Sequence, residues 1–123
     1  MPDQPCPFCE IVSRRAPATV LFRWPDTIAI RPLNPVVDGH VLVIPTAHVA
    51  DFSEDPVVAA TTMQRAAHLA GVYPEVPMNV ITSRGREATQ SVFHLHLHLV
   101  PRAENDGLAL PWYSGRSRKL EDA

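Results

Sequence analysis

Apolar residues of the chain gather in short runs that are separated by proline, glycine and polar residues. Four of these runs have the length and composition of strands, at residues 19–23, 27–31, 40–45 and 78–82. The third of them, HVLVIP, is almost wholly apolar, which indicates a buried strand. The pattern therefore predicts a sheet whose strands come from most of the chain.

A fifth strand is expected at residues 90–100, where histidine and leucine alternate with the strand period of two. His94, His96 and His98 should lie on one face of it, and the leucines on the other face, against the core. The alternative to a functional site is a row of surface histidines on a half-exposed strand that has no role in function. Such clusters are rare away from functional sites, so the pattern favours a site.

Two helices are expected besides the strands. A short one should cover residues 10–13, after the sequence C-P-F-C. A long one should begin at Pro56, with Ser53 or Asp55 as its cap, and end just before Gly71. Strands, one long helix and then two more strands predict an α+β protein with a mainly antiparallel sheet.

The chain has 123 residues, which suffices for one domain, expected at residues 1–113, with a flexible C-terminal tail at 114–123. A net charge of −2 argues against binding to nucleic acid or to an acidic membrane surface. No apolar run reaches the length of a membrane span. The N-terminus lacks a secretory pattern and two cysteines three residues apart cannot cross-link a secreted fold, so a cytoplasmic location is expected.

Residues 94–100, HLHLHLV, have the pattern H-φ-H-φ-H-φ-φ, in which φ is an apolar residue. This pattern fits the signature of the histidine triad (HIT) family at every position, so the segment resembles that family. Residues 39–48, GHVLVIPTAH, resemble its G-H-x-L-x-I-P-x-x-H segment, and Gly85 with Q-S-V at 90–92 resembles its glycine turn and lead-in. Residues 106–112 resemble its C-terminal segment. The C-x-x-C start is similar to that of bacterial members.

This resemblance implies a HIT-like fold, which is a five-stranded antiparallel sheet with one long and one short helix, usually in a homodimer. It implies hydrolysis at the α-phosphate of nucleoside phosphoramidates, adenylates or dinucleoside polyphosphates, so the partner would be a small nucleotide with a purine nucleoside monophosphate moiety. By the same resemblance, His96 would be the nucleophile that becomes nucleotidyl-histidine. His98 and His40 would contact the phosphate and the leaving group.

The nucleotide-binding residues expected are Ser83, Gly85, Gln90 and Ser91, which lie in the segments that carry the resemblance, and Asn34, which lies outside them. The serine of the Q-S-V segment would donate a hydrogen bond to phosphate. Many members hold the ribose with an acidic or amide side chain where this chain has proline, at position 32, and Asn34 is the nearest side chain that could replace it. The turn S-R-G-R at 83–86 is either a phosphate-binding turn or a solvated basic loop.

A C-x-x-C motif alone is ambiguous between a redox pair and half of a zinc site. No strand precedes Cys6, which argues against the redox pair, and Cys6, Cys9, His48 and His94 would together form a Cys₂His₂ set for a structural zinc. Free structural thiols are the alternative.

Two other functions remain open on the sequence alone. One is a zinc hydrolase whose catalytic metal is held by His94 and His96. The other is a non-catalytic nucleotide-binding or regulatory protein. An intact triad argues against the second, because a pure binder has no evident need for the nucleophile.

Overall fold

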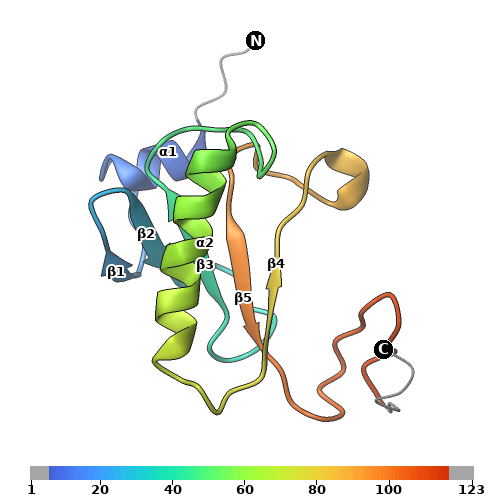
Figure 1. Cartoon of the computed structure of the whole chain (residues 1–123). Helices are drawn as coiled ribbons and strands as arrows, with labels where there is room; N and C mark the ends of the chain where they lie inside the picture. The colour runs from blue at the N-terminus through green and yellow to red at the C-terminus, as the bar shows by residue number, and fades with distance from the viewer. Residues whose placement is uncertain (1–5, 117–123) are drawn as a thin grey trace.

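The computed structural model describes residues 6–116 (Figure 1). In chain order its elements are α1 (Pro7–Val12), β1 (Val20–Arg23), β2 (Thr27–Ile30), β3 (Val41–Pro45), α2 (Pro56–Gly71), β4 (Met78–Ile81), a 3₁₀ turn (Arg86–Ala88) and β5 (Leu97–Pro101). The strands form one antiparallel sheet in the order β1-β2-β3-β5-β4. The predicted fold class, with five strands, one long helix and one short helix, is confirmed.

Each face of the sheet carries an apolar cluster. Side chains alternate between the faces, so Ile28 and Ile30 join a cluster with Phe8 of α1, whereas Ala29 joins a cluster with Ala66 of α2. Figure 1 shows α2 lying across one face of the sheet. The α2 cluster also contains Trp24, Val43, Val49, Leu95, Leu97 and Leu99, and the α1 cluster also contains Leu42 and Ile44. Among the described residues, no helix is long and apolar enough to cross a membrane.

Both helices begin at proline. The first helical turn tolerates proline because an N–H at that position has no partner within the helix, so its loss costs no hydrogen bond. Asp55, one of the two predicted caps, caps α2: its carboxylate accepts hydrogen bonds from the N–H groups of Val57 and Val58. Gly71 is the last residue of α2 and not the first beyond it. α1 begins three residues before the predicted start because the Cys6 sulfur accepts the N–H of Cys9 and so caps the helix.

The fifth strand is shorter than predicted, because β5 starts at Leu97 and residues 90–96 are irregular. Backbone groups of that segment bond outside the sheet: the Leu95 N–H donates to the Val49 carbonyl, at 2.7 Å. Leu97 and Leu99 face the α2 cluster, as expected. The prediction of a continuous strand over residues 90–100 was therefore wrong for its first seven residues.

Arg102, directly after β5, holds the C-terminal segment against the sheet. Its guanidinium donates to both carboxylate oxygens of Asp106, at 2.7 and 3.0 Å, and to the Leu108 carbonyl, at 2.6 Å. These bonds to Arg102 hold the pKa of Asp106 well below its ordinary value. The N–H of Gly107 donates to the carbonyl of Gly115, at 2.8 Å. Of the tail expected at 114–123, residues 117–123 lie outside the described part of the chain.

Candidate active site and metal centre

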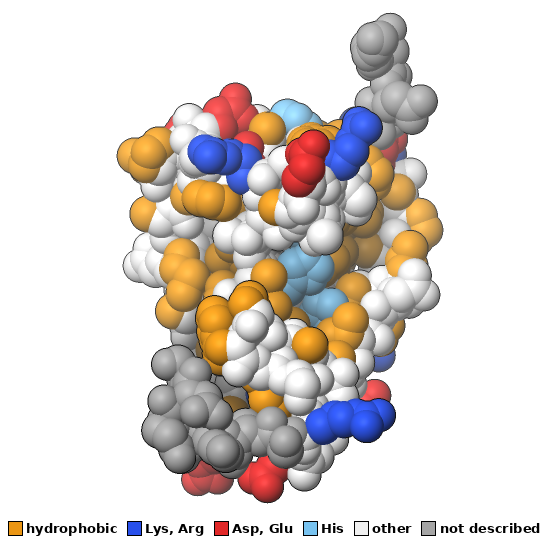
Figure 2. All heavy atoms as spheres, turned by 90° about the vertical axis from the view of Figure 1, so that its right-hand side faces the viewer, with side chains coloured by type: hydrophobic (Ala, Val, Ile, Leu, Met, Phe, Trp, Pro, Cys, Tyr) orange, Lys and Arg blue, Asp and Glu red, His pale blue; other side chains and the backbone are white. Residues whose placement is uncertain are grey.

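A cavity of about 990 Å³ opens on the α1 side of the sheet. Apolar side chains of α1, β2 and β3 form much of its wall, among them Phe8. Its polar lining includes Asn34, Ser91, His96 and His98. Figure 2 shows histidine side chains in a hollow of one face, bordered by hydrophobic side chains. A hollow with apolar walls and a few converging polar groups is the usual form of a small-molecule site.

The ring of His96 is fixed by a hydrogen bond to the chain just before it. Its Nδ1 lies 2.8 Å from the carbonyl oxygen of His94, and a carbonyl accepts only, so Nδ1 carries the proton. Nε2 of His96 therefore has the lone pair, and no group among the described residues forms a hydrogen bond with it. The Phe8 ring meets the His96 ring edge-on, with centroids 5.0 Å apart. Burial lowers the pKa of His96, which keeps the imidazole neutral and able to attack an electrophile.

The tautomer of His98 is set by His40, whose own tautomer is set by a backbone N–H. The N–H of Val36 donates to Nδ1 of His40, at 3.1 Å, so the proton of the His40 ring is on Nε2. That Nε2–H donates to Nδ1 of His98, at 3.0 Å, which leaves the Nε2–H of His98 as a donor on the other side of its ring. Burial, and then His96 and His40, lower the pKa of His98 to about 4. Burial also lowers the pKa of His40.

The structure brings some of the expected nucleotide-binding residues to the cavity and not others. Asn34 and Ser91 line it, whereas Ser83, Gly85 and Gln90 do not. The Gln90 amide instead accepts the N–H of Gly85, at 2.8 Å, and donates to the carbonyls of Ala50 and Val92. Gln90 thus holds the turn at 83–89 in place.

The basic part of the same turn is exposed. Arg84 donates to the Ser53 hydroxyl, at 3.1 Å, and Arg86 begins the 3₁₀ turn on the surface. Neither arginine lines the cavity. These positions agree with the solvated basic loop more than with a phosphate-binding turn.

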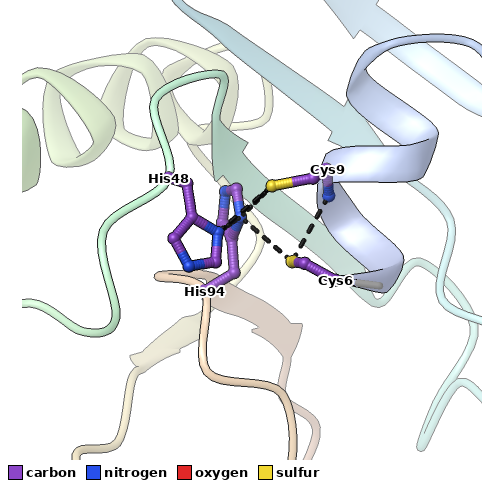
Figure 3. Close-up of side chains that lie close together, drawn as sticks. All are labelled: Cys6, Cys9, His48 and His94. Carbon is purple, nitrogen blue, oxygen red and sulfur yellow. Dashed lines mark hydrogen bonds between the residues drawn. The ribbon is translucent and has the colours of Figure 1, made fainter. Parts of the chain in front are cut away.

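The described residues contain one group of His and Cys side chains that could hold a metal ion: Cys6, Cys9, His48 and His94. Figure 3 shows the two cysteines on the first turn of α1 and its cap, facing two histidines that come from loops. One ligand atom from each residue lies within 4.8 Å of the other three. Nδ1 of His94 is 3.1 Å from Nδ1 of His48 and 3.5 Å from Sγ of Cys9.

The tautomer of His94 suits a metal ligand. Its Nε2 lies 2.9 Å from the carbonyl oxygen of Pro45, so Nε2 carries the proton and the Nδ1 lone pair faces the cluster. Burial, followed by the Cys6 sulfur, raises the pKa of Cys9 to about 11, so without a cation this thiol would stay protonated. Two imidazole nitrogens and two sulfurs that face one another fit a cation between them.

Two contacts at the site were not foreseen from the sequence. Phe8 lies between the two cysteines in the chain and touches the rings of both His94 and His96. Thr82 donates its hydroxyl to the carbonyl oxygen of His96, at 2.8 Å. The first could have been suspected from an aromatic inside C-x-x-C, whereas no local pattern marks the second.

The lowered pKa of His98 predicts that the fold loses stability in mild acid. In the unfolded chain this imidazole takes up a proton near pH 6.5, but in the folded protein only near pH 4. The unfolded state therefore binds more protons between these values, and the free energy of unfolding falls as the pH drops through that window. His98 accounts for about 2 kcal/mol between pH 7 and pH 5, or roughly 5–10 °C in Tm.

Thermal melts of the parent and of His98→Asn across this range check the prediction. The Tm of the variant should fall less steeply with acid. His40 and His96 face His98 and also titrate in both proteins, and their charges lower the pKa of His98, so the difference between the two slopes reports His98 together with its coupling to these two rings. Equal slopes in the two proteins would contradict the assignment to His98.

Comparisons with known proteins converge on one family. A family model described as HIT domain matches residues 13–105. An uncharacterized HIT-like protein of Mycobacterium tuberculosis is 34% identical over 111 residues, which cover 86% of this chain and 77% of the relative. An adenosine 5'-monophosphoramidase of Saccharomyces cerevisiae is 34% identical over 112 residues, 89% of this chain and 71% of that protein. The solved structure of a HIT family protein from Bacillus anthracis matches this one with a TM-score of 0.77 at 34% sequence identity, and the matched part covers 89% of this chain and 82% of that protein's chain.

Proposed function

The chain belongs to the HIT domain family, and from this membership we propose that it is a nucleotide hydrolase acting at the α-phosphate. Its substrates would be nucleoside phosphoramidates, adenylates or dinucleoside polyphosphates. The observation that carries the proposal is the free Nε2 of His96, a neutral imidazole nitrogen in the wall of a cavity. A relative that acts on adenosine 5'-monophosphoramidate supports the same substrate class.

The reaction would proceed in two displacements. First, Nε2 of His96 attacks the α-phosphorus, the bond from phosphorus to the leaving nitrogen or oxygen breaks, and the leaving group takes up a proton. Water then attacks the same phosphorus, loses a proton, and the phosphorus–nitrogen bond to His96 breaks. One water is consumed, and a nucleoside monophosphate and the protonated leaving group are released. The covalent intermediate divides one difficult step into two easier ones.

The neighbouring donors would stabilise the charge that develops on phosphate. The Nε2–H of His98 and the hydroxyl of Ser91 line the same cavity as His96, so they are assigned to the phosphate oxygens. His40 does not line the cavity and is assigned to His98, whose tautomer it sets. Preorganised donors of this kind cost no reorganisation during the reaction, and they supply much of the rate in acyl and phosphoryl transfer.

We assign a structural zinc to Cys6, Cys9, His48 and His94. Zinc bonds of about 2.3 Å to sulfur and about 2.0 Å to nitrogen place tetrahedral nitrogens about 3.3 Å from each other and about 3.5 Å from sulfur. The two nitrogens here are 3.1 Å apart, and the sulfur–nitrogen distances of Cys9 to His48, Cys6 to His94 and Cys9 to His94 are 3.1, 3.4 and 3.5 Å. A zinc at this point would link α1 to the loops after β3 and before β5.

The rival with a catalytic zinc on His94 and His96 has less support. Nδ1 of His94 faces the cysteines, and His96 is not a member of the cluster among the described residues. The Nδ1 of His96 is already hydrogen-bonded to the His94 carbonyl. The nitrogen that faces the cluster and the nitrogen proposed for attack therefore belong to different rings.

A panel of adenosine and guanosine phosphoramidates, adenylates and dinucleoside polyphosphates, with products identified by mass, tests the function. Nucleoside monophosphate should be released from at least one class. Tight nucleotide binding without release from any of them would favour the non-catalytic binding protein instead. The homodimer and the cytoplasmic location remain predictions, which a sedimentation experiment and fractionation of the source cells would check.

The ribose should be held weakly. Pro32 and Asn34 both line the cavity, and proline offers no side-chain acceptor to a cis-diol. One hydrogen bond in a partly open site contributes about 1 kcal/mol, so kcat/KM for matched adenosine and deoxyadenosine phosphoramidates should differ by less than about tenfold. Asn34→Ala should remove most of that difference. A strong ribose preference that Asn34→Ala leaves unchanged would show that another group holds the diol.

A further inference from the structure

The backbone of His96 lies just beyond the paired part of the sheet. β5 begins at Leu97, one residue after it. Pairing of β5 with β4 ends at Ile81 and His98, and pairing of β5 with β3 ends at Leu97. On both sides, therefore, the strands stop before they reach His96. The residue proposed to attack the substrate lies where the sheet no longer fixes the chain.

Two other hydrogen bonds hold this residue. Thr82, the first residue after β4, donates its hydroxyl to the His96 carbonyl oxygen, at 2.8 Å. The His96 ring, in turn, donates its Nδ1–H to the His94 carbonyl oxygen, also at 2.8 Å. Thr82 thus fixes the peptide of His96, and the His94 carbonyl fixes its ring. The hydroxyl takes the place of a ladder N–H, but a single side-chain substitution removes it.

The attacking nitrogen is sensitive to this peptide. Nε2 is on the far side of the ring from the backbone, so a small rotation at the His96 peptide moves Nε2 more than it moves any atom close to the main chain. Displacement at phosphorus needs the attacking atom in line with the leaving group, and a misplacement of about 1 Å can cost about 10²-fold in rate. Loss of the Thr82 bond should therefore affect the reaction rate.

We propose that Thr82 is a positioning residue for the nucleophile. The inference rests on the proposed function of His96. Thr82 does not line the cavity, so its effect should fall on kcat and not on substrate affinity. A hydroxyl that is needed for its hydrogen bond can be replaced by serine but not by valine, which has the shape of threonine without the donor.

Thr82→Val, Thr82→Ala and Thr82→Ser form the test, on a nucleoside phosphoramidate that the parent hydrolyses. Thr82→Val and Thr82→Ala should each lower kcat by about five- to tenfold, which is the change in rate that corresponds to the free energy of one neutral hydrogen bond. KM should stay within about twofold of the parent value. Thr82→Ser should keep kcat close to that of the parent. Melting curves of all three variants confirm that the chains are folded.

Thr62 provides a matched control in the same protein. Its hydroxyl also donates to a backbone carbonyl, that of Val58, at 2.7 Å, but it lies inside α2 and away from the cavity. Thr62→Val should change the Tm and leave kcat unchanged. A similar loss of kcat in Thr62→Val and Thr82→Val would mean that any lost hydroxyl lowers activity through stability, and the positioning role would be rejected.

A second readout separates this inference from the proposed function. If Thr82 orders His96, the Nδ1–H proton of His96 should exchange with water faster in Thr82→Val than in the parent, as followed by ¹⁵N NMR of the imidazoles. Parental kcat and parental exchange in Thr82→Val would overturn the inference while the hydrolase stands. A parent that turns over no substrate would sink the proposed function, and the exchange rates alone would then decide whether Thr82 orders His96.

Discussion

Replacement of His96 by alanine is expected to lower kcat on a nucleoside phosphoramidate by at least about 10³-fold. The substitution removes the ring nitrogen proposed to attack, and the remaining donors assigned to the cavity can only bind and polarise the phosphate. His96 is outside β5 and only partly buried, so the fold should persist. Steady-state kinetics on the folded variant give the measurement, with circular dichroism as the check on structure.

A histidine away from the cavity serves as the control. His68 is exposed on α2, and His68→Ala should keep kcat within about twofold of the parent. In the parent, a slowly hydrolysed adenylate should leave an adenylyl group on the peptide that contains His96, if acid is avoided during the workup. Undiminished turnover by His96→Ala, or an adduct mapped to another histidine, would rule out the mechanism.

Removal of the metal is expected to lower the Tm by about 10–20 °C. The proposed zinc joins α1, which is only six residues long, to two loops, and such a short helix has little stability of its own. Metal analysis should find about one zinc per chain in protein purified without chelator. A chelator should then lower the Tm far more than it lowers turnover measured at low temperature, because the attacking nitrogen is not a ligand.

Cys9→Ser supplies the matched test, because it removes one ligand and changes little else. The variant should melt as low as the chelated parent, and the chelator should lower its Tm no further. Loss of turnover in step with loss of metal, in protein that is still folded, would favour the catalytic zinc instead. A parent that holds no stoichiometric metal would reject the assignment to these four residues.

The sequence by itself determined the fold class and the family resemblance, and it picked out the four residues Cys6, Cys9, His48 and His94 that cluster in the structure. Histidine and leucine alternate at the strand period, and this pattern alone is enough to place Leu97 and Leu99 on the core side. Apolar runs bounded by proline and polar residues marked the other four strands to within one residue. These features follow from local rules, because side-chain direction and capping depend on neighbours a few residues away.

The sequence could not determine where β5 begins. A strand lasts only as long as its partners, and β3 and β4 are paired with β5 over a few residues only. The sequence also did not reveal that the Gln90 side chain binds the backbone carbonyl of Ala50 and does not line the cavity. Both facts depend on where a distant part of the chain lies in the folded protein.

Only the tertiary structure decided which ring nitrogen of His94, His40 and His98 carries the proton. The Pro45 carbonyl turns the Nδ1 of His94 to the cysteines, and the N–H of Val36 sets the ring of His40, which in turn sets the ring of His98. These partners are far from the triad in sequence, and Pro45 and Val36 make their contacts through the backbone, which no side chain marks. The physical reason is that a tautomer is fixed by the nearest backbone donor or acceptor, and folding alone brings that group to the ring.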